Sequence, residues 1–475
     1  MIMKDLLKFL LLSVLFIICN SVAASDNAES YGNRINQSEY PVSSDVEPKI
    51  NSNKDLAVLE AGVENTINVN LDDCIRLALG NNPRIQSAMQ DVFASNTRIK
   101  QVWANYFPEF SWQSGYSRIR QLQLSDVFQE NLIYNFWVLG QISGSQLLYD
   151  FGVTQNQATI RKLDMLGYKI ILTGTVNDVV YLVKDAYYNL LYAIESKKIA
   201  EANVKEYEKF YEQAKGFYTA GMKPKIDVTI AEVNLSNAKL MQIQASHNVY
   251  IAMSKLNNAI GIPYYTKYIP SDKLQFIPCD INLSKAIEVC EKSRPEFELA
   301  RVKVEQSLQN YKLVKKSWFP QFITQGQFEV GGRHPDSNYG YTFGAYINFP
   351  TINGMELKYR LREASVLYCR EQSNEKITRN NVYYEVQNAY YTLDEKKNKL
   401  PVAYLGMKQA KQNYELSSGR YKVGVGDPIE LNDAQVQCKN AQLVYYQTLY
   451  ELNSAHAKLE KTIGRNIVQD GVLLQ

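Results

Sequence analysis

The stretch Pro320-Gln-Phe-Ile-Thr-Gln-Gly-Gln-Phe-Glu-Val330 decides which fold we expect for this chain. After its proline, the even-numbered positions are mostly apolar or small and the odd-numbered positions are mostly polar. This alternation has the period of two that is typical of a β-strand. The residues before it follow a helical pattern, and proline ends such a helix because it has no N–H for the hydrogen-bond ladder. Residues 108–117, Pro-Glu-Phe-Ser-Trp-Gln-Ser-Gly-Tyr-Ser, repeat the arrangement. The sequence therefore predicts that a helix gives way to a strand at two places.

Both places belong to a duplication that extends over most of the chain. Landmarks of the first copy return after 212 residues (283 − 71) and, further along, after 203 residues (424 − 221). The pairs are Leu71/Leu283, Pro83/Pro295, Pro108/Pro320 and Phe110/Phe322 at the longer interval, and Ala186/Ala389, Gly221/Gly424 and Gly261/Gly464 at the shorter one. A tandem solenoid repeats every 20 to 50 residues or so. The long interval indicates two copies of one structural unit, at 66–263 and 281–466, joined by a linker at 264–280.

Each copy is expected to contain two strands joined by a loop. We place the strands at 108–120 and 135–149 in the first copy, with a loop at 121–134. In the second copy they lie at 320–332 and 339–350. Alternation of this kind with aromatic residues at the ends is typical of transmembrane β-barrel strands, although an amphipathic hairpin on a soluble protein is the alternative. Because a small closed barrel needs about eight strands, four strands that span a membrane would require oligomerisation.

Aromatic residues gather where the predicted helices and strands meet. In a membrane protein such residues form a girdle at the interface between lipid and water. The candidates are Trp103, Phe107, Trp112, Trp318, Phe319 and Phe322.

The remainder of each copy is predicted to be long helices. The first copy has a helical pattern at 152–220, and the second has one at 354–423 if Pro401 only kinks the helix. A helix of this length would extend about 100 Å. Glycine followed by proline then marks a reversal, and return helices are expected at 225–261 and 428–463. Small residues recur every seven positions along the return helices and would let a neighbouring helix approach closely.

Composition excludes several classes of protein. The chain has 52 basic and 49 acidic residues without a basic stripe, so nucleic acid is not an expected partner. Its three histidines are scattered, and no P-loop or nucleophile motif occurs, so we expect neither an enzyme nor a cofactor. The cysteines have no C-x-x-C or other metal-like spacing and are expected to be small buried side chains.

The two ends of the chain have the composition of processed or flexible segments. Residues 1–24 combine Lys4 and Lys8 with an apolar run and a Val22-Ala-Ala24 end, which predicts a secretory signal peptide. Acylation of Cys19 in a lipoprotein is the alternative. Residues 25–65 are rich in polar side chains and indicate a flexible leader, and 467–475 form a C-terminal tail.

Taken together, these residues resemble the TolC family of outer-membrane efflux and secretion channels over essentially the whole mature chain. The resemblance rests on the motif LDDCIRLALGNNP at 71–83, the prolines at the two junctions, Tyr149-Asp-Phe-Gly152 and the two reversals. It implies an α+β membrane protein with a duplicated unit of long coiled-coil helices and β-hairpins. In a homotrimer, this unit would form a 12-stranded barrel in outer-membrane lipid, continuous with an α-helical periplasmic barrel.

The resemblance also implies a function, that of a passive conduit in a tripartite efflux pump or type I secretion system. Its periplasmic tip would dock onto a periplasmic adaptor protein and an inner-membrane transporter. A soluble periplasmic coiled-coil scaffold or adaptor is the alternative class. The sequence does not indicate which substrate passes.

The resemblance assigns residues at the tip to gating. Glu430 and Asp433 match the acidic channel gate, and being three apart on a helix they would face one way and form a ring of carboxylates in a trimer. Glu430 is also well explained as part of a helix start in which Asp427 is the N-cap. Asp227 is equally explained as a charge that stabilises a helix N-terminus. Tip closure or adaptor docking is assigned to Asp227, Tyr421, Gly221, Gly424 and Tyr218. An arginine that completes the closing link in the family corresponds here to Gly426, which leaves the closing mechanism open.

Overall fold

The computed structural model describes residues 67–124, 129–263, 266, 268–276, 282–333, 338–350, 353–423 and 425–464. The expected signal peptide, leader and C-terminal tail lie outside the described residues, as do Cys19, Cys279 and Gly424. The chain divides into two compact units. The sheet unit includes Phe93–Gly167 and Val302–Ser373, and the helical unit includes Tyr168–Arg301, Asn374–Gln475 and the described part of Lys49–Val92.

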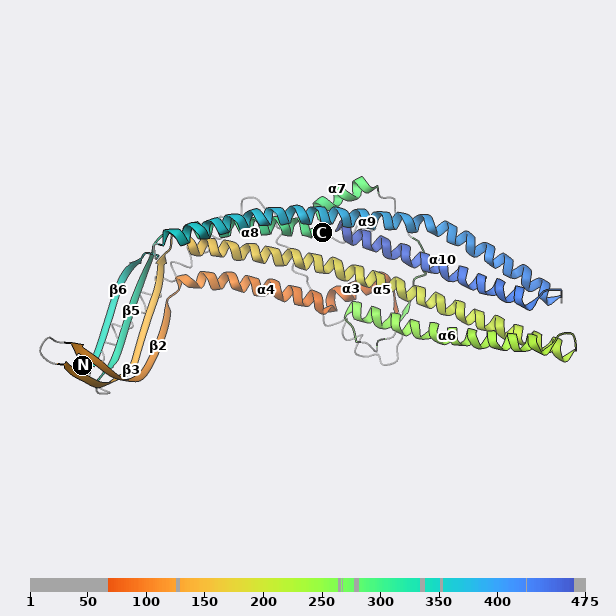
Figure 1. Cartoon of the computed structure of the whole chain (residues 1–475), viewed down its shortest axis with the longest axis horizontal. Coiled ribbons are helices and arrows are strands. Elements are labelled where there is room, and N and C mark those ends of the chain that lie inside the picture. The colour runs from red at the N-terminus through yellow and green to blue at the C-terminus, as the bar shows by residue number, and fades with distance from the viewer. Residues whose placement is uncertain are drawn as a thin grey trace. The chain divides into compact units, whose positions relative to one another are not determined.

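The sheet unit is built on four antiparallel strands in the order β2-β3-β5-β6 (Figure 1). They are β2 (Glu109–Leu124), β3 (Gln129–Tyr149), β5 (Gln321–Gly332) and β6 (Asn338–Asn348). The two hairpins, one from each copy, meet where β3 pairs with β5. The duplication thus produces one continuous sheet.

The first hairpin is longer than the sequence pattern suggested. The loop expected at 121–134 is wrong at both ends, because β2 continues to Leu124 and β3 begins at Gln129. The ladder extends to the pair Leu124 and Gln129. The physical reason is visible in the sequence, where leucine and glutamine continue to alternate over residues 121–124 and keep the period of a strand.

Long helices account for most of the remaining residues. The two longest are α5 (Val153–Thr219) and α9 (Gly354–Lys422), and α9 continues through Pro401. Their return helices are α6 (Lys225–Ile260) and α10 (Pro428–Ile463). The other elements are β1 (Ile67–Val69), α3 (Leu71–Asn81), α4 (Pro83–Trp103), the 3-10 helix η1 (Ala104–Tyr106), β4 (Tyr268–Pro270), α7 (Leu283–Ser293) and α8 (Pro295–Lys316). In the described part of the chain, every helix is too short or too polar to cross a membrane.

The duplication relates the two largest cores of the helical unit to each other. In the first, Val179, Val183 and Ala186 of α5 pack with Leu256 and Ile260 of α6. Their counterparts 203 residues later make the second core, which contains Val382, Val386, Ala389, Leu459 and Ile463. The expected small residues of the return helices are buried where they face neighbours, as Ala231, Ala238, Ala434 and Thr448 show.

Cysteine and alanine exchange places between the two cores. Cys74 and Ala78 of α3 are buried in the first core, and Ala286 and Cys290 of α7 occupy the equivalent positions in the second. Each core therefore keeps one small apolar side chain and one thiol. Cys438 is also buried, but Cys369 on α9 is exposed, so the expectation of buried cysteines is wrong for that residue.

Each return helix ends at a glycine that lies against the end of the short helix at the start of the same copy, α3 in the first copy and α7 in the second. Gly261 and Gly464 have φ of 86° and 78°, in the left-handed region. A Cβ on Gly261 would lie 2.9 Å from the carbonyl oxygen of Asn81, and one on Gly464 would lie 2.8 Å from that of Ser293. Only glycine permits this conformation and this approach without strain.

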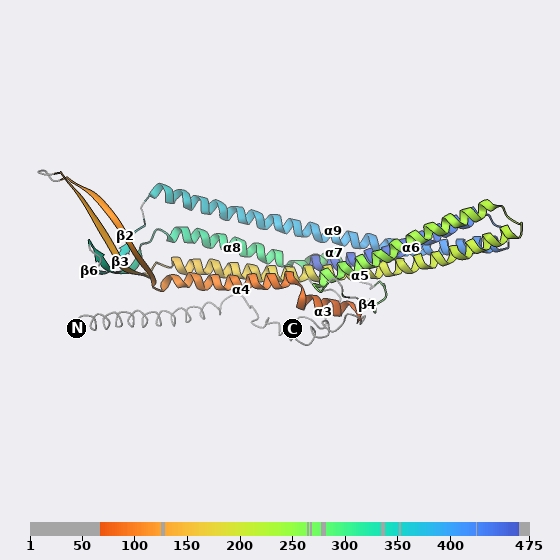
Figure 2. The ribbon, with the colours of Figure 1, turned by 90° about the horizontal axis from the view of Figure 1, so that it is seen from below.

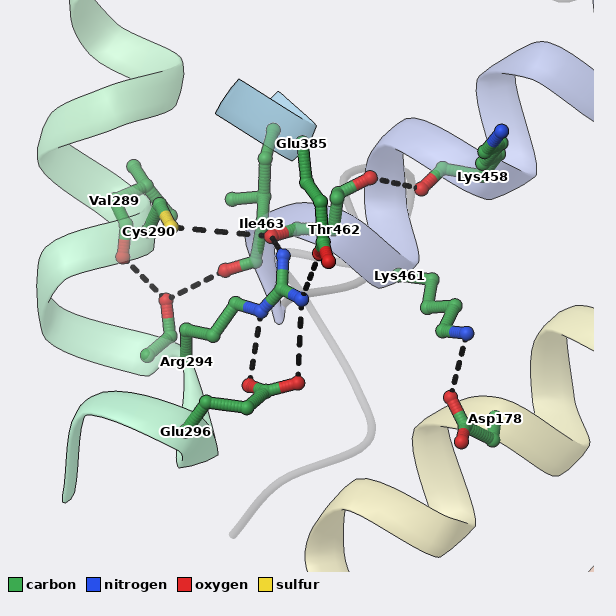
Figure 3. A network of polar contacts seen from close by, with 11 residues as sticks. Asp178, Val289, Cys290, Arg294, Glu296, Glu385, Lys458, Lys461, Thr462 and Ile463 are labelled. Carbon is green, nitrogen blue, oxygen red and sulfur yellow. Dashed lines mark hydrogen bonds and ion pairs between the residues drawn. The ribbon is translucent and has the colours of Figure 1, made fainter. Parts of the chain in front are cut away.

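Next to these glycines, the two copies use different side chains for the same contact. Asn82 donates to the carbonyl oxygen of Ala259 over 2.7 Å, and Arg294, its counterpart, donates to that of Thr462 over 2.8 Å. Arg294 also forms ion pairs with Glu296 and Glu385 (Figure 3). The guanidinium is buried and satisfied by several acceptors, as a buried charge must be.

Candidate functional site

In its central rows, the four-stranded sheet has one apolar and one polar face. Residues paired across an antiparallel sheet point to the same side, and the next pair along points to the other. Two rows of partners on the apolar face are Trp112, Ile142, Phe328, Tyr341 and Phe110, Gly144, Gly326, Phe343. Two rows on the polar face are Ser111, Ser143, Gln327, Thr342 and Gln113, Gln141, Glu329, Gly340.

The aromatic side chains of the apolar face are open to their surroundings. Trp112, Tyr341 and Phe343 are 78%, 79% and 76% exposed in the single chain. Residues 322–330 carry the apolar face along β5, and at about 3.3 Å per residue they extend roughly 26 Å. The apolar band of a transmembrane barrel is about 25 Å tall, and its interior is polar. The sheet thus has the height and the two-faced character of a barrel wall.

The outer strands of this sheet keep one edge unpaired among the described residues. β2 pairs with β3 alone and β6 with β5 alone. The exposed edge of a strand presents free N–H and C=O groups to any other strand that can reach it. Edges of 16 and 11 residues are long enough to form extended ladders.

Asp150 organises the junction between sheet and helix. Its buried carboxylate accepts hydrogen bonds from the backbone N–H of Thr154 over 2.6 Å and of Gly152 over 3.1 Å, so it caps the start of α5. The hydroxyl of Tyr106 donates to the same carboxylate over 3.0 Å. Burial, with the negative charge of Asp150, raises the pKa of Tyr106 to about 12. The motif at 149–152 is therefore a structural cap, which reasoning from the sequence used only as a family signature.

The expected girdle residues do not all gather at one place. Phe319 stacks on Phe151 with a centroid distance of 5.2 Å, and Phe322 lies 6.2 Å from the same ring. Trp103 stacks on Tyr106, with a centroid distance of 6.1 Å. Phe107 and Trp318 are about half exposed, and Trp112 lies on the apolar face of the sheet.

The second candidate site lies in the helical unit, where two helix reversals lie side by side (Figure 1, Figure 2). One joins α5 to α6 through Gly221, whose φ is 70°, and Tyr218 beside it is 45% exposed. The other joins α9 to α10. We call the two reversals together the tip.

Tyr421 is the centre of the small core at the tip. It is 1% exposed, and its ring stacks on Phe210 with a centroid distance of 4.7 Å. Its hydroxyl is buried and makes no hydrogen bond with any described residue of the chain. Burial and the charge of Asp227 raise the pKa of Tyr421. The charge of Asp227 thus acts on Tyr421, but no hydrogen bond joins these two residues within the chain.

Glu430 has a partner that the sequence did not reveal. Its Oε1 accepts a hydrogen bond from Nη1 of Arg420 over 2.9 Å, and Oγ of Ser417 lies 3.5 Å from the same atom. Asp427 caps the helix start, as the sequence indicated, because its Oδ1 accepts a hydrogen bond from the N–H of Ile429. Asp433 is exposed and forms no ion pair or hydrogen bond with the described residues.

Within the helical unit, polar contacts between α5 and α10 join the first copy of the duplication to the second. The buried side chains of Lys184 and Glu460 form an ion pair of 2.6 Å. Towards the tip, Nε2 of Gln435 donates to Asn203 over 3.2 Å, and the hydroxyl of Tyr207 donates to Asn432 over 3.0 Å. We call this set of contacts the α5–α10 seam. Sequence reasoning missed it because its residues are not repeated between the copies.

Comparison with known proteins agrees with the architecture. Residues 74–262 and 286–465 match the model of the outer membrane efflux protein family. Over 344 residues, the chain is 23% identical to nodulation protein T of Rhizobium leguminosarum bv. trifolii, covering 68% of this chain and 71% of the relative.

Two solved channels share the fold. The CmeC outer membrane channel of Campylobacter jejuni superposes with a TM-score of 0.70 at 16% identity, covering 83% of this chain and 85% of that one. The MtrE outer membrane channel of Neisseria gonorrhoeae, solved in its open state, superposes with a TM-score of 0.65 at 19% identity, covering 83% of this chain and 89% of that one. The family consists of channel proteins rather than enzymes. The resemblance to TolC is confirmed, and the chain belongs to the outer membrane efflux protein family, as a channel protein of the outer membrane that extends into the periplasm.

Proposed function

We propose that the protein is the passive, trimeric conduit of an efflux pump or type I secretion system. The observation that carries this proposal is the open, two-faced sheet. Four strands are too few to close a barrel, and three chains would supply twelve. Closure would pair the free edges of β2 and β6 between neighbouring chains, remove every exposed edge, and turn the polar face towards the lumen.

The helices offer a second reason for assembly. Apolar side chains stay exposed on two helices, most of them at intervals of seven residues, as in a coiled-coil seam without its partner. On α6 they are Ile226, Val233, Leu240, Ile243 and Tyr250, and on α9 they are Ile377, Tyr384, Tyr391 and Leu405. Packing of α6 from one chain against α9 of the next would bury both stripes and close the periplasmic tube.

The aromatic residues around the helix–strand junctions are proposed to contact outer-membrane lipid at the periplasmic interface. Phe107, Trp318 and Phe319 are each about half exposed there. Rings of this kind favour the level of the lipid headgroups.

The tip is proposed to gate the conduit and to dock the periplasmic adaptor, which links it to an inner-membrane transporter. Asp433 and Glu430 supply carboxylates at the start of α10, where three chains would form a ring. Apolar side chains of the tip are strongly exposed, with Met222 at 67% and Val423 and Val425 at 75% each. A partner protein would cover such a patch.

Fractionation and conductance test the proposal together. The mature protein should be recovered from the outer membrane by detergent as a trimer and should form ion-conducting channels in planar bilayers. Both results follow from barrel closure, since only a closed lumen conducts. A monomeric protein without conductance would contradict the proposal.

A further inference from the structure

The tip of the second copy contains an ion pair within one chain. Arg420 lies in the last turn of α9 and Glu430 in the first turn of α10, and their side chains are 58% and 42% exposed. A pair this exposed contributes little to stability, because water screens it. The pair matters because the positive charge of the Arg420 guanidinium, 2.9 Å from the carboxylate oxygen of Glu430, offsets the negative charge of that carboxylate.

The backbone of the reversal explains why these two residues meet. The N–H groups of Val425 and Gly426 both donate to the carbonyl oxygen of Arg420, at 3.1 and 3.0 Å. A Cβ at Gly426 would lie 2.7 Å from the backbone nitrogen of Tyr421. No side chain fits at position 426 in this turn, so an arginine is excluded there. The same tight turn brings Arg420 to Glu430.

The other charges nearby are arranged differently. Asp433 lies one helical turn beyond Glu430 and forms no ion pair with the described residues. Lys422, also exposed in the last turn of α9, does not pair with Glu430. In the first copy, phenylalanine occupies position 217, the counterpart of Arg420, so Asp227 has no equivalent arginine.

We propose that Arg420 determines the ionic selectivity of the tip by neutralising Glu430, so that, of the two gate carboxylates, Asp433 is the one without an ion pair among the described residues. This inference rests on the proposed trimeric conduit. A ring of three free carboxylates, instead of six, attracts multivalent cations less strongly and hinders anionic cargo less. Arg420 is thus a specificity-determining residue, although it is not one of the acidic gate residues.

Block of single channels by hexamminecobalt(III) in planar bilayers tests the assignment. Arg420→Gln should free Glu430 and lower the half-blocking concentration about tenfold, since each trivalent ion gains attraction to three more charges. Lys422→Gln is the matched control, because it removes the same charge from the same turn without freeing Glu430, and its effect should be clearly smaller. The double variant Arg420→Gln/Glu430→Gln should block at nearly the wild-type concentration.

Three results would overturn the inference: unchanged or weaker block in Arg420→Gln, an equal effect of Lys422→Gln, or a double variant that blocks as tightly as Arg420→Gln. Asp433→Asn separates this inference from the proposed gate. Loss of block in Asp433→Asn together with an unchanged Arg420→Gln would leave the gate intact and reject the role of Arg420. A wild-type protein that forms no channel would reject both.

Discussion

The glycines at the ends of the two return helices show how much depends on single positions. Gly464→Ala would force a Cβ into a left-handed backbone and to 2.8 Å from the carbonyl oxygen of Ser293. We expect a loss of stability of about 2 kcal/mol or more, seen as a lower unfolding temperature in detergent. Gly216→Ala, in the last turn of α5, where an added Cβ would meet nothing within 4 Å, should instead be neutral or stabilising. Equal effects of the two substitutions would contradict the argument.

His456 should make the α5–α10 seam sensitive to acid. It is 9% exposed, and its Nδ1 lies 3.8 Å from Oε1 of Glu460, the ion-pair partner of Lys184. Burial lowers the pKa of His456 in the folded protein, the charge of Lys184 lowers it further, and Glu460 opposes both. Below the ordinary histidine pKa of about 6.5, the unfolded chain therefore binds a proton that the folded chain does not. Unfolding then takes up protons, so stability falls as the pH drops below that value.

The measurement is the unfolding temperature of the detergent-solubilised protein between pH 5 and 8. In His456→Gln, the unfolding temperature should fall less at acidic pH than in the wild type. The control is His247→Gln, which replaces an exposed histidine on α6. A decline that is the same in His456→Gln and wild type would assign the acid sensitivity to other groups.

At the scale of one element, β6 should tolerate charge on only one of its faces. Phe343 belongs to the apolar face, and Thr342, its neighbour, belongs to the polar face. Phe343→Lys should cost about 2–4 kcal/mol of stability in the membrane, because lysine would face lipid. Thr342→Lys should still assemble and should shift ion selectivity towards anions. Heat-modifiable trimers on gels and reversal potentials in bilayers measure the two effects, and equal tolerance would reject the orientation of the sheet.

Elements were predictable to different degrees. The change from period 3.6 to period 2 at Pro108 and Pro320 was readable because proline and alternation are local signals. The limits of the first hairpin were not, since a polar run can be a turn or the exposed part of a ladder. Whether Pro401 breaks a helix could not be read either, because packing of neighbouring helices can offset one missing hydrogen bond.

At the scale of the whole molecule, we expect that the tip opens when the helix pair α9–α10 of the second copy moves away from α5. The α5–α10 seam near the tip is made of polar contacts such as Asn203 with Gln435, so its parting exposes little apolar surface. Cross-linking Asn203→Cys with Gln435→Cys by a short bis-maleimide should lower export. The control joins Glu208→Cys to Lys239→Cys, an ion-paired position within the α5–α6 hairpin, and should leave export unchanged. Normal export with the first pair cross-linked would show that the seam stays closed.

The sequence by itself determined the duplication, the order of helices and strands, the two-faced strands and the reversals. These follow from periodicity, proline and glycine, which act over a few residues. Only the tertiary structure decided which charges meet: Arg420 with Glu430 across a reversal, and Lys184 with Glu460, which lie 276 residues apart in the chain. The physical reason is that an ion pair depends on the distance between two side chains in space, and that distance is set by how tightly the turns and helices between them pack.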